Sequence, residues 1–178
     1  MLFKVGTVEI HQILAATGLV ITSLGFAAPA HAQNVIKCSA VAAGGEIKVD
    51  GANNRFDKAC DVTLAKDLHI KPLNPGAKIN LTPTSTHTHG LIINSNGHKV
   101  TIEGVDFTFD RGFAIDIIGK QGTGDVEVKN AKIVDTRSAG VGCQSSDEDR
   151  FGLILYRVGN VQMDNFQVMG AGAQPRLQ

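Results

Sequence analysis

The sequence repeats one eight-residue pattern three times. Each copy has apolar residues at positions one and three, glycine or asparagine at position five, and apolar residues at positions six and eight. The copies begin at Val100, Val126 and Val161 and read Val-Thr-Ile-Glu-Gly-Val-Asp-Phe, Val-Glu-Val-Lys-Asn-Ala-Lys-Ile and Val-Gln-Met-Asp-Asn-Phe-Gln-Val. Repeats of about 20–30 residues are typical of stacked architectures, in which each unit buries its apolar face against its neighbours. The chain is therefore expected to fold as a stack of similar units.

Within each copy, apolar and polar residues alternate, which indicates a strand with one buried face. The alternation breaks at Gly104, Asn130 and Asn165. Glycine and asparagine tolerate the left-handed backbone conformation, so we expect the chain to bend there while the flanking apolar side chains all point inward. Asn130 and Asn165 would then hydrogen-bond along the stack.

A second motif, glycine followed by an apolar run, precedes each copy and predicts a third strand per unit. Its inward side chains are expected to be Leu91 and Ile93, Phe113 and Ile115, and Leu153 and Leu155. Weaker copies of the strand patterns occur at 46–49, 61–64, 68–70 and 78–81. Three short parallel strands per unit predict an all-β fold, a parallel β-helix. Two other folds fit the sequence less well. The consensus of leucine-rich repeat proteins is absent, and an immunoglobulin-like sandwich would not produce aligned columns of side chains.

Three segments resemble the opening coils of right-handed β-helix proteins of the pectate-lyase-like superfamily. They are Cys60-Asp-Val-Thr-Leu-Ala-Lys-Asp-Leu, His89-Gly-Leu-Ile-Ile and Asn96-Gly-His-Lys-Val-Thr-Ile-Glu-Gly, and the resemblance runs from about residue 46 to residue 170. It implies a right-handed parallel β-helix with a carbohydrate-associated surface. The superfamily contains polysaccharide lyases, hydrolases, epimerases and non-catalytic exported proteins, and the fold alone does not choose among them.

The first 32 residues have the features of a cleaved signal peptide. Lys4 provides a weak basic region, Ile13–Phe26 is apolar and uncharged, and Ala30-His-Ala32 is a small-x-small cleavage site. We expect residues 33–178 to form a single short β-helix domain in the periplasm of a bacterium or outside the cell.

The two ends of that domain are expected to differ. Residues 34–45 are suited to cap the N-terminal end of the stack, whose edges would otherwise be exposed. Residues 170–178 lack an apolar set able to close the last coil. The C-terminal end is therefore expected to be open or to associate with another copy.

The composition limits the partners. The chain has 17 basic and 17 acidic residues, one tyrosine and no tryptophan. It thus lacks the basic surface of nucleic-acid-binding proteins, and no segment beyond the signal peptide is apolar enough to span a membrane. Export permits a disulfide. Cys38 and Cys60 are the nearest pair in sequence, although pairing of Cys143 with either of them stays open.

The long insertion between the second and third copies is a candidate for a binding loop, since loops that leave a repeat scaffold often line its binding face. It carries acidic residues between two arginines: Asp147, Glu148 and Asp149 between Arg137 and Arg150. Carboxylates at short spacing can bind Ca²⁺. The family resemblance implies a lyase reaction in which Ca²⁺ and one of these arginines act on a uronate α-proton. The spacing is not that of a regular Ca²⁺ loop, so a solvated polar loop is the simpler interpretation.

A second candidate group contains Asp106, Asp110, Arg111 and Asp116. Paired carboxylates on an outward β-helix face can hydrolyse glycosides, but the polygalacturonase signatures are absent. His87 and His89 lie on one side of an extended segment and would need a third ligand to hold a metal. No motif requires a cofactor.

Three functions follow from these observations. The first is a non-catalytic exported module that binds a polysaccharide or another surface polymer through Asp106, Asp110, Arg111, Arg137 and Tyr156. The alternatives are a Ca²⁺-dependent polysaccharide lyase or epimerase and a structural protein that assembles through its open C-terminal coil.

Overall fold

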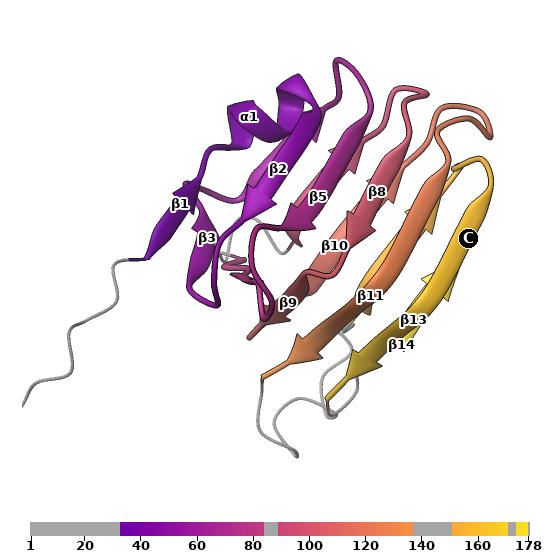
Figure 1. Ribbon diagram of the computed structural model, residues 1–178. Coiled ribbons are helices and arrows are strands. Elements are labelled where there is room, and N and C mark those ends of the chain that lie inside the picture. Colours follow the sequence, from indigo (N-terminus) through magenta and orange to yellow (C-terminus); the bar gives the residue numbers. More distant parts are fainter. Residues whose placement is uncertain (1–32, 84–88, 137–150, 171–173, 178) are drawn as a thin grey trace, which may run out of the picture. The chain divides into compact units, whose positions relative to one another are not determined.

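The computed structural model describes residues 33–83, 89–136, 151–170 and 174–177, with side chains up to Gly170. All of them belong to a compact unit that begins at His31. The described residues form one short helix and two β-sheets (Figure 1).

The larger sheet has nine strands among the described residues: β1 (Asn34–Ile36), β2 (Gly45–Val49), β3 (Asn54–Phe56), β5 (Leu68–Pro72), β6 (Lys78–Asn80), β8 (Val100–Glu103), β9 (Asp106–Phe109), β11 (Val126–Asp135) and β13 (Val161–Met169). The smaller sheet contains β4 (Cys60–Thr63), β7 (His89–Asn94), β10 (Phe113–Ile118), β12 (Phe151–Tyr156) and β14 (Gln174–Leu177).

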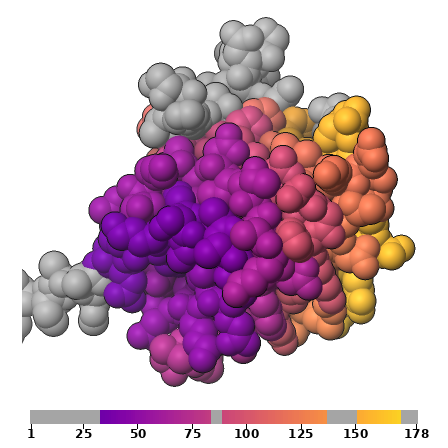
Figure 2. Space-filling model, turned by 90° about the horizontal axis from the view of Figure 1, so that it is seen from above, coloured from indigo at the N-terminus to yellow at the C-terminus, as the bar shows by residue number. Residues whose placement is uncertain are grey.

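Every pairing between these strands is parallel, and the chain passes repeatedly from one sheet to the other. The larger sheet has two branches, β2-β5-β8 and β1-β3-β6-β9, which meet on the long strand β11. The first half of β11 pairs with β8 and the second half with β9, while β13 follows β11 along both halves. The sheets therefore curl around a shared core, and the colours in Figure 2 run in sequence order from one end of this unit to the other. The prediction of an all-β fold made of parallel strands is confirmed.

The predicted columns of apolar side chains are present in register. Val126 is aligned with Val100 on one side and with Val161 on the other. The next columns align Ile102, Val128 and Met163, then Ala131 and Phe166, then Phe107, Ile133 and Val168. The members on β8, β9 and β11 are all buried. The weaker strand patterns earlier in the chain are also confirmed as β2, β4, β5 and β6.

The predicted bends lie at the fifth position of each repeat. Gly104, Asn130 and Asn165 have φ angles of 63°, 49° and 47°, all in the left-handed region. Asn165 Nδ2 donates a hydrogen bond of 2.9 Å to Asn130 Oδ1. The asparagine contact along the stack is therefore confirmed.

The expected inward position of Phe113 is wrong. Ile115, not Phe113, is aligned with Leu91, while Phe113 is aligned with His89 and is only half-buried. Aligning the repeats on Gly112 shifted this strand by two residues. Gly112, at φ 57°, belongs to the turn before β10 because a positive φ suits a turn and not a strand.

Helix α1 (Cys38–Ala43) covers the N-terminal end of the stack. Cys38 and Val41 are buried in the core, and Cys38 forms a disulfide with Cys60 on β4 at a Cα–Cα distance of 5.5 Å. The predicted disulfide is confirmed, and it is compatible with a compartment outside the cytoplasm. The described part of the chain has no helix with the length and apolar character needed to cross a membrane. The signal-peptide prediction and Cys143 lie outside the described residues.

Candidate functional site

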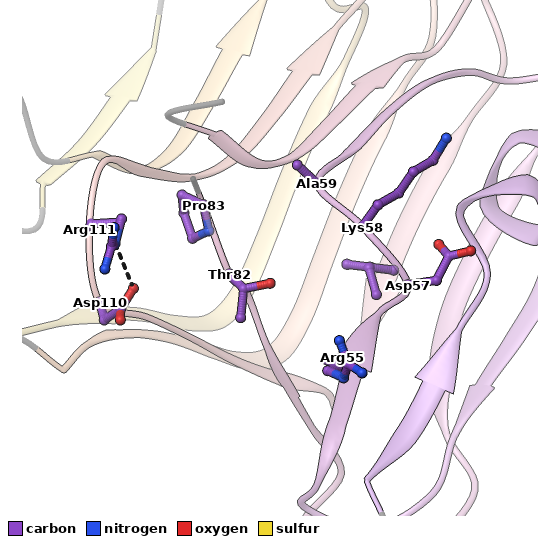
Figure 3. A pocket seen from close by; sticks show the side chains of 9 residues that line it. Arg55, Asp57, Lys58, Ala59, Thr82, Pro83, Asp110 and Arg111 are labelled. Carbon is purple, nitrogen blue, oxygen red and sulfur yellow. Dashed lines mark ion pairs between the residues drawn. The ribbon is translucent and has the colours of Figure 1, made fainter. Parts of the chain in front are cut away.

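An open pocket of about 480 Å³ lies where the turns after β3, β6 and β9 come together (Figure 3). Its lining residues come from three segments that are distant in sequence: Arg55, Phe56, Asp57, Lys58 and Ala59; Thr82 and Pro83; Asp110 and Arg111. We call it the corner pocket.

The parallel stacking of the strands explains why these segments meet. β3 pairs with β6 and β6 pairs with β9, so the residues after each strand leave the larger sheet at the same edge. The alternation in β3 buries Asn54 and Phe56 and leaves Arg55 half-exposed on the outer side. Asn54 Nδ2 donates hydrogen bonds to the carbonyl oxygens of Gly51 at 2.8 Å and Lys78 at 2.9 Å, which ties β3 to its neighbours next to the pocket.

The cations of the corner pocket are incompletely neutralised. Asp57 accepts a hydrogen bond of 2.9 Å from the backbone N–H of Cys38, and Lys37 Nζ lies 3.7 Å from its other oxygen. The hydrogen bond from Cys38 is the main reason that the pKa of Asp57 lies below its usual value. Asp57 therefore stays ionised but is already engaged by groups outside the pocket.

The arginines of the pocket keep unused donors. Arg111 Nε lies 3.6 Å from Asp110 Oδ1, and both side chains are about 60% exposed. Arg55 Nε is buried and has no hydrogen-bond partner in the protein. Buried polar groups are nearly always hydrogen-bonded, so Arg55 Nε is an exception beside the pocket.

The structure brings together two of the predicted polymer-binding residues, Asp110 and Arg111, in the corner pocket. Asp106, at the other end of β9, does not line the pocket and accepts a hydrogen bond of 3.0 Å from the backbone N–H of Lys132. Tyr156 ends β12 in the smaller sheet, where the guanidinium of Arg157 lies 4.9 Å from its ring centroid. These residues therefore do not form one continuous site.

The proposed Ca²⁺ ligands and catalytic arginines fall outside the described residues: Arg137, Asp147, Glu148, Asp149 and Arg150. Within the described residues, no cluster of three or more histidine, cysteine, aspartate or glutamate side chains is arranged to hold a metal ion.

Sequence reasoning missed a histidine–aspartate pair on the smaller sheet. His89 Nδ1 and Asp116 Oδ2 are 2.8 Å apart, although neither His89 Nδ1 nor Asp116 Oδ1 is aligned for a hydrogen bond. Asp116 is only 8% exposed, and this burial raises its pKa despite the opposing attraction of His89. The His89 ring stacks on Phe113 at 4.5 Å, and Phe113 stacks on Phe151 at 5.6 Å.

The space beside this pair is small. A hollow of about 30 Å³ lies between Ala59, Cys60, Asp61, His89 and Ile92. Such a volume suits about one water molecule and not a sugar ring. The sequence singled out His89 as a possible metal ligand and Asp116 as a member of the carboxylate group, but no pattern in it paired the two residues.

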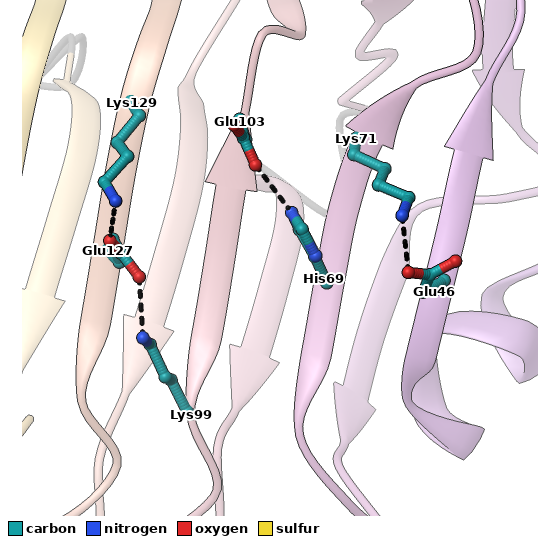
Figure 4. A network of polar contacts seen from close by, with 7 residues as sticks. All are labelled: Glu46, His69, Lys71, Lys99, Glu103, Glu127 and Lys129. Atoms are coloured by element: carbon teal, nitrogen blue, oxygen red, sulfur yellow. Dashed lines mark hydrogen bonds and ion pairs between the residues drawn. The ribbon is translucent and has the colours of Figure 1, made fainter.

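The outer face of β2, β5, β8 and β11 carries a ladder of ion pairs (Figure 4). Its members are Glu46, His69, Lys71, Lys99, Glu103, Glu127 and Lys129. Glu127 lies between Lys99, at 2.6 Å, and Lys129, and these two lysines lower its pKa to about 2. Acids and bases are paired closely with each other on this face, whereas the arginines of the corner pocket keep unused donors.

Comparisons with known proteins return nothing for this chain. It matches no protein-family model, no curated protein and no solved structure. The candidate site is therefore inferred from the structure of this chain alone.

Proposed function

We propose that this chain is a short right-handed parallel β-helix protein, exported through a cleaved signal peptide, that binds an acidic surface polymer without cutting it. The in-register apolar columns and the regular passage between the two sheets support the β-helix. The Cys38–Cys60 disulfide supports export.

The corner pocket is the observation that carries the binding function. The cationic residues Arg55, Lys58 and Arg111 line it, although the Lys58 side chain extends away from Asp110 and Arg111 (Figure 3), and one of its two carboxylates is engaged elsewhere. Guanidinium groups bind carboxylates with two parallel hydrogen bonds. A uronate-rich polymer offers such carboxylates along an extended chain, and a pocket open to solvent can hold one of them without enclosing the polymer's ends.

Quantitative binding to defined polymers tests this function. We expect polygalacturonate or alginate to bind the purified protein, neutral pullulan not to bind, and added salt to weaken the binding. Replacing both pocket arginines, Arg55→Gln and Arg111→Gln, should weaken binding at least about tenfold, since a hydrogen bond to a charged group contributes about 1.5–3 kcal/mol.

Lys48→Gln is the matched control, because Lys48 is an exposed cation on the outer face of β2, away from the pocket. Binding that the double variant leaves unchanged, or that Lys48→Gln weakens equally, would contradict the proposal. The same mixtures, followed with and without Ca²⁺ for the absorbance of unsaturated uronate ends, test for cleavage. A Ca²⁺-dependent rise would replace the binding function with a lyase.

A further inference from the structure

Strand β13 leaves an apolar column uncovered at the C-terminal end of the described stack. Val161 and Met163 are 40% and 37% exposed, whereas their aligned neighbours on β11, Val126 and Val128, are 1% exposed. Among the described strands, β13 pairs only with β11, so its other backbone edge has no strand beside it.

This edge carries few of the features that keep natural edge strands from pairing. Such strands usually carry lysine, proline or inward-pointing charges. β13 has neither lysine nor proline, and Asp164 is its one charged residue. The neighbouring end strand β14 differs, since Pro175 has no N–H to donate to a further strand.

The sequence of β13 is nearly symmetric about its bend. Residues 161–168 read Val-Gln-Met-Asp-Asn-Phe-Gln-Val, so the order of apolar and polar residues is the same in both directions. The left-handed residue Asn165 breaks the alternation. Val161 and Met163 before it, and Phe166 and Val168 after it, therefore all belong to the inward columns.

We propose that two copies of this protein pair through β13, antiparallel and around a two-fold axis at the bend. Val161 then faces Val168 of the second copy, and Met163 faces its Phe166. The polar positions match as well: Gln162 faces Gln167 and Asp164 faces Asn165, so no like charges lie directly opposite each other.

The asymmetry of the two ends selects a second copy in this orientation. Among the described strands, the open edges of the larger sheet at the N-terminal end are those of β1 and β2; β2 carries the exposed charges Glu46 and Lys48 and lacks the symmetric pattern of β13. An isologous contact between two C-terminal ends matches β13 with itself and closes the assembly as a dimer. The inference does not depend on the polymer-binding function.

The mass of the purified protein as a function of concentration is the first test. We expect a shift from monomer to dimer between about 1 and 100 µM, a range suited to a small interface. Met163→Lys should weaken the dimer at least about tenfold, because it places a charge in the apolar contact. Leu73→Lys is the matched control, since Leu73 is an exposed apolar residue, 55% exposed, in the turn after β5. Circular dichroism would verify that both variants fold.

Cross-linking tests the register. In a Cys143→Ser background, Gln162→Cys and Gln167→Cys chains should form a mixed disulfide when combined, faster than either variant cross-links with itself. A protein that stays monomeric at about 200 µM, or a dimer that Met163→Lys leaves intact, would overturn the inference. Equal cross-linking in all three samples would overturn the antiparallel register. Protection from hydrogen exchange, in a monomer, of the β13 amides that point away from β11 would assign the edge to another segment of the same chain.

Discussion

Val126→Ala and Val161→Ala are the same substitution at aligned positions of neighbouring repeats, yet we expect them to lower the free energy of unfolding by different amounts. Val126 is 1% exposed on β11, and Val161 is 40% exposed on β13. The two residues are aligned in neighbouring parallel strands and belong to the same column, but only Val126 has a strand on both sides, so the comparison reports the effect of burial.

The magnitudes follow from that difference. Removing two methyl-sized groups from full burial loses about 1.6 kcal/mol of transfer free energy. The cavity left in a packed core adds about 1 kcal/mol, so Val126→Ala should destabilise the protein by about 2.5 kcal/mol. Val161 retains about 60% of that burial and encloses no cavity when truncated, so its replacement should cost about 1 kcal/mol.

Urea unfolding followed by circular dichroism measures both values. The protein concentration should stay below about 1 µM, so that pairing through β13 does not stabilise the native state. The slopes of the transitions should match that of the unchanged protein, so that the midpoints report stability alone. Losses within about 0.5 kcal/mol of each other, or a larger loss for Val161→Ala, would refute the assignment of β13 as an uncovered end.

The shifted pKa values of Glu127 and Asp116 predict opposite dependences of stability on pH. The pKa of Glu127 is lowered to about 2, mainly by Lys129, so its contribution to stability is present above pH 4.5 and is lost as the pH falls towards 2. Lys129→Gln should raise the Glu127 pKa measured by NMR titration, and an unchanged midpoint would contradict this cause. The pKa of Asp116 is raised from 3.8 by burial, so the ionised form destabilises the fold as the pH rises above 3.8. The urea midpoint of Asp116→Asn should therefore rise relative to that of the unchanged protein as the pH increases. A difference between the two midpoints that does not change with pH would show that His89 fully compensates the cost of burying the carboxylate.

The candidate site was harder to predict than the fold. Asp110 and Arg111 were found because they form a polar turn between two strand patterns. Arg55 and Lys58 carried no comparable signal, since an isolated cation beside a short strand resembles any solvated side chain. Their place in the corner pocket depends on which turns stack above one another, and that depends on the length of each connection in the chain.

The sequence by itself determined the local geometry of this protein. Period-two alternation specifies which side chains face the core, and a glycine or asparagine at the break specifies the bend, because only the residues within one strand are involved. The close sequence spacing of Cys38 and Cys60 likewise pointed to their disulfide. Only the tertiary structure decided the register of β10, because Gly112 in the turn before this strand has the same sequence context as the glycine of the strand motif. The positions of the corner pocket and of the uncovered edge at β13 were also decided only by the tertiary structure. These features arise between segments more than about 20 residues apart, such as those of Arg55 and Arg111, and the patterns within each segment do not encode how the segments are aligned.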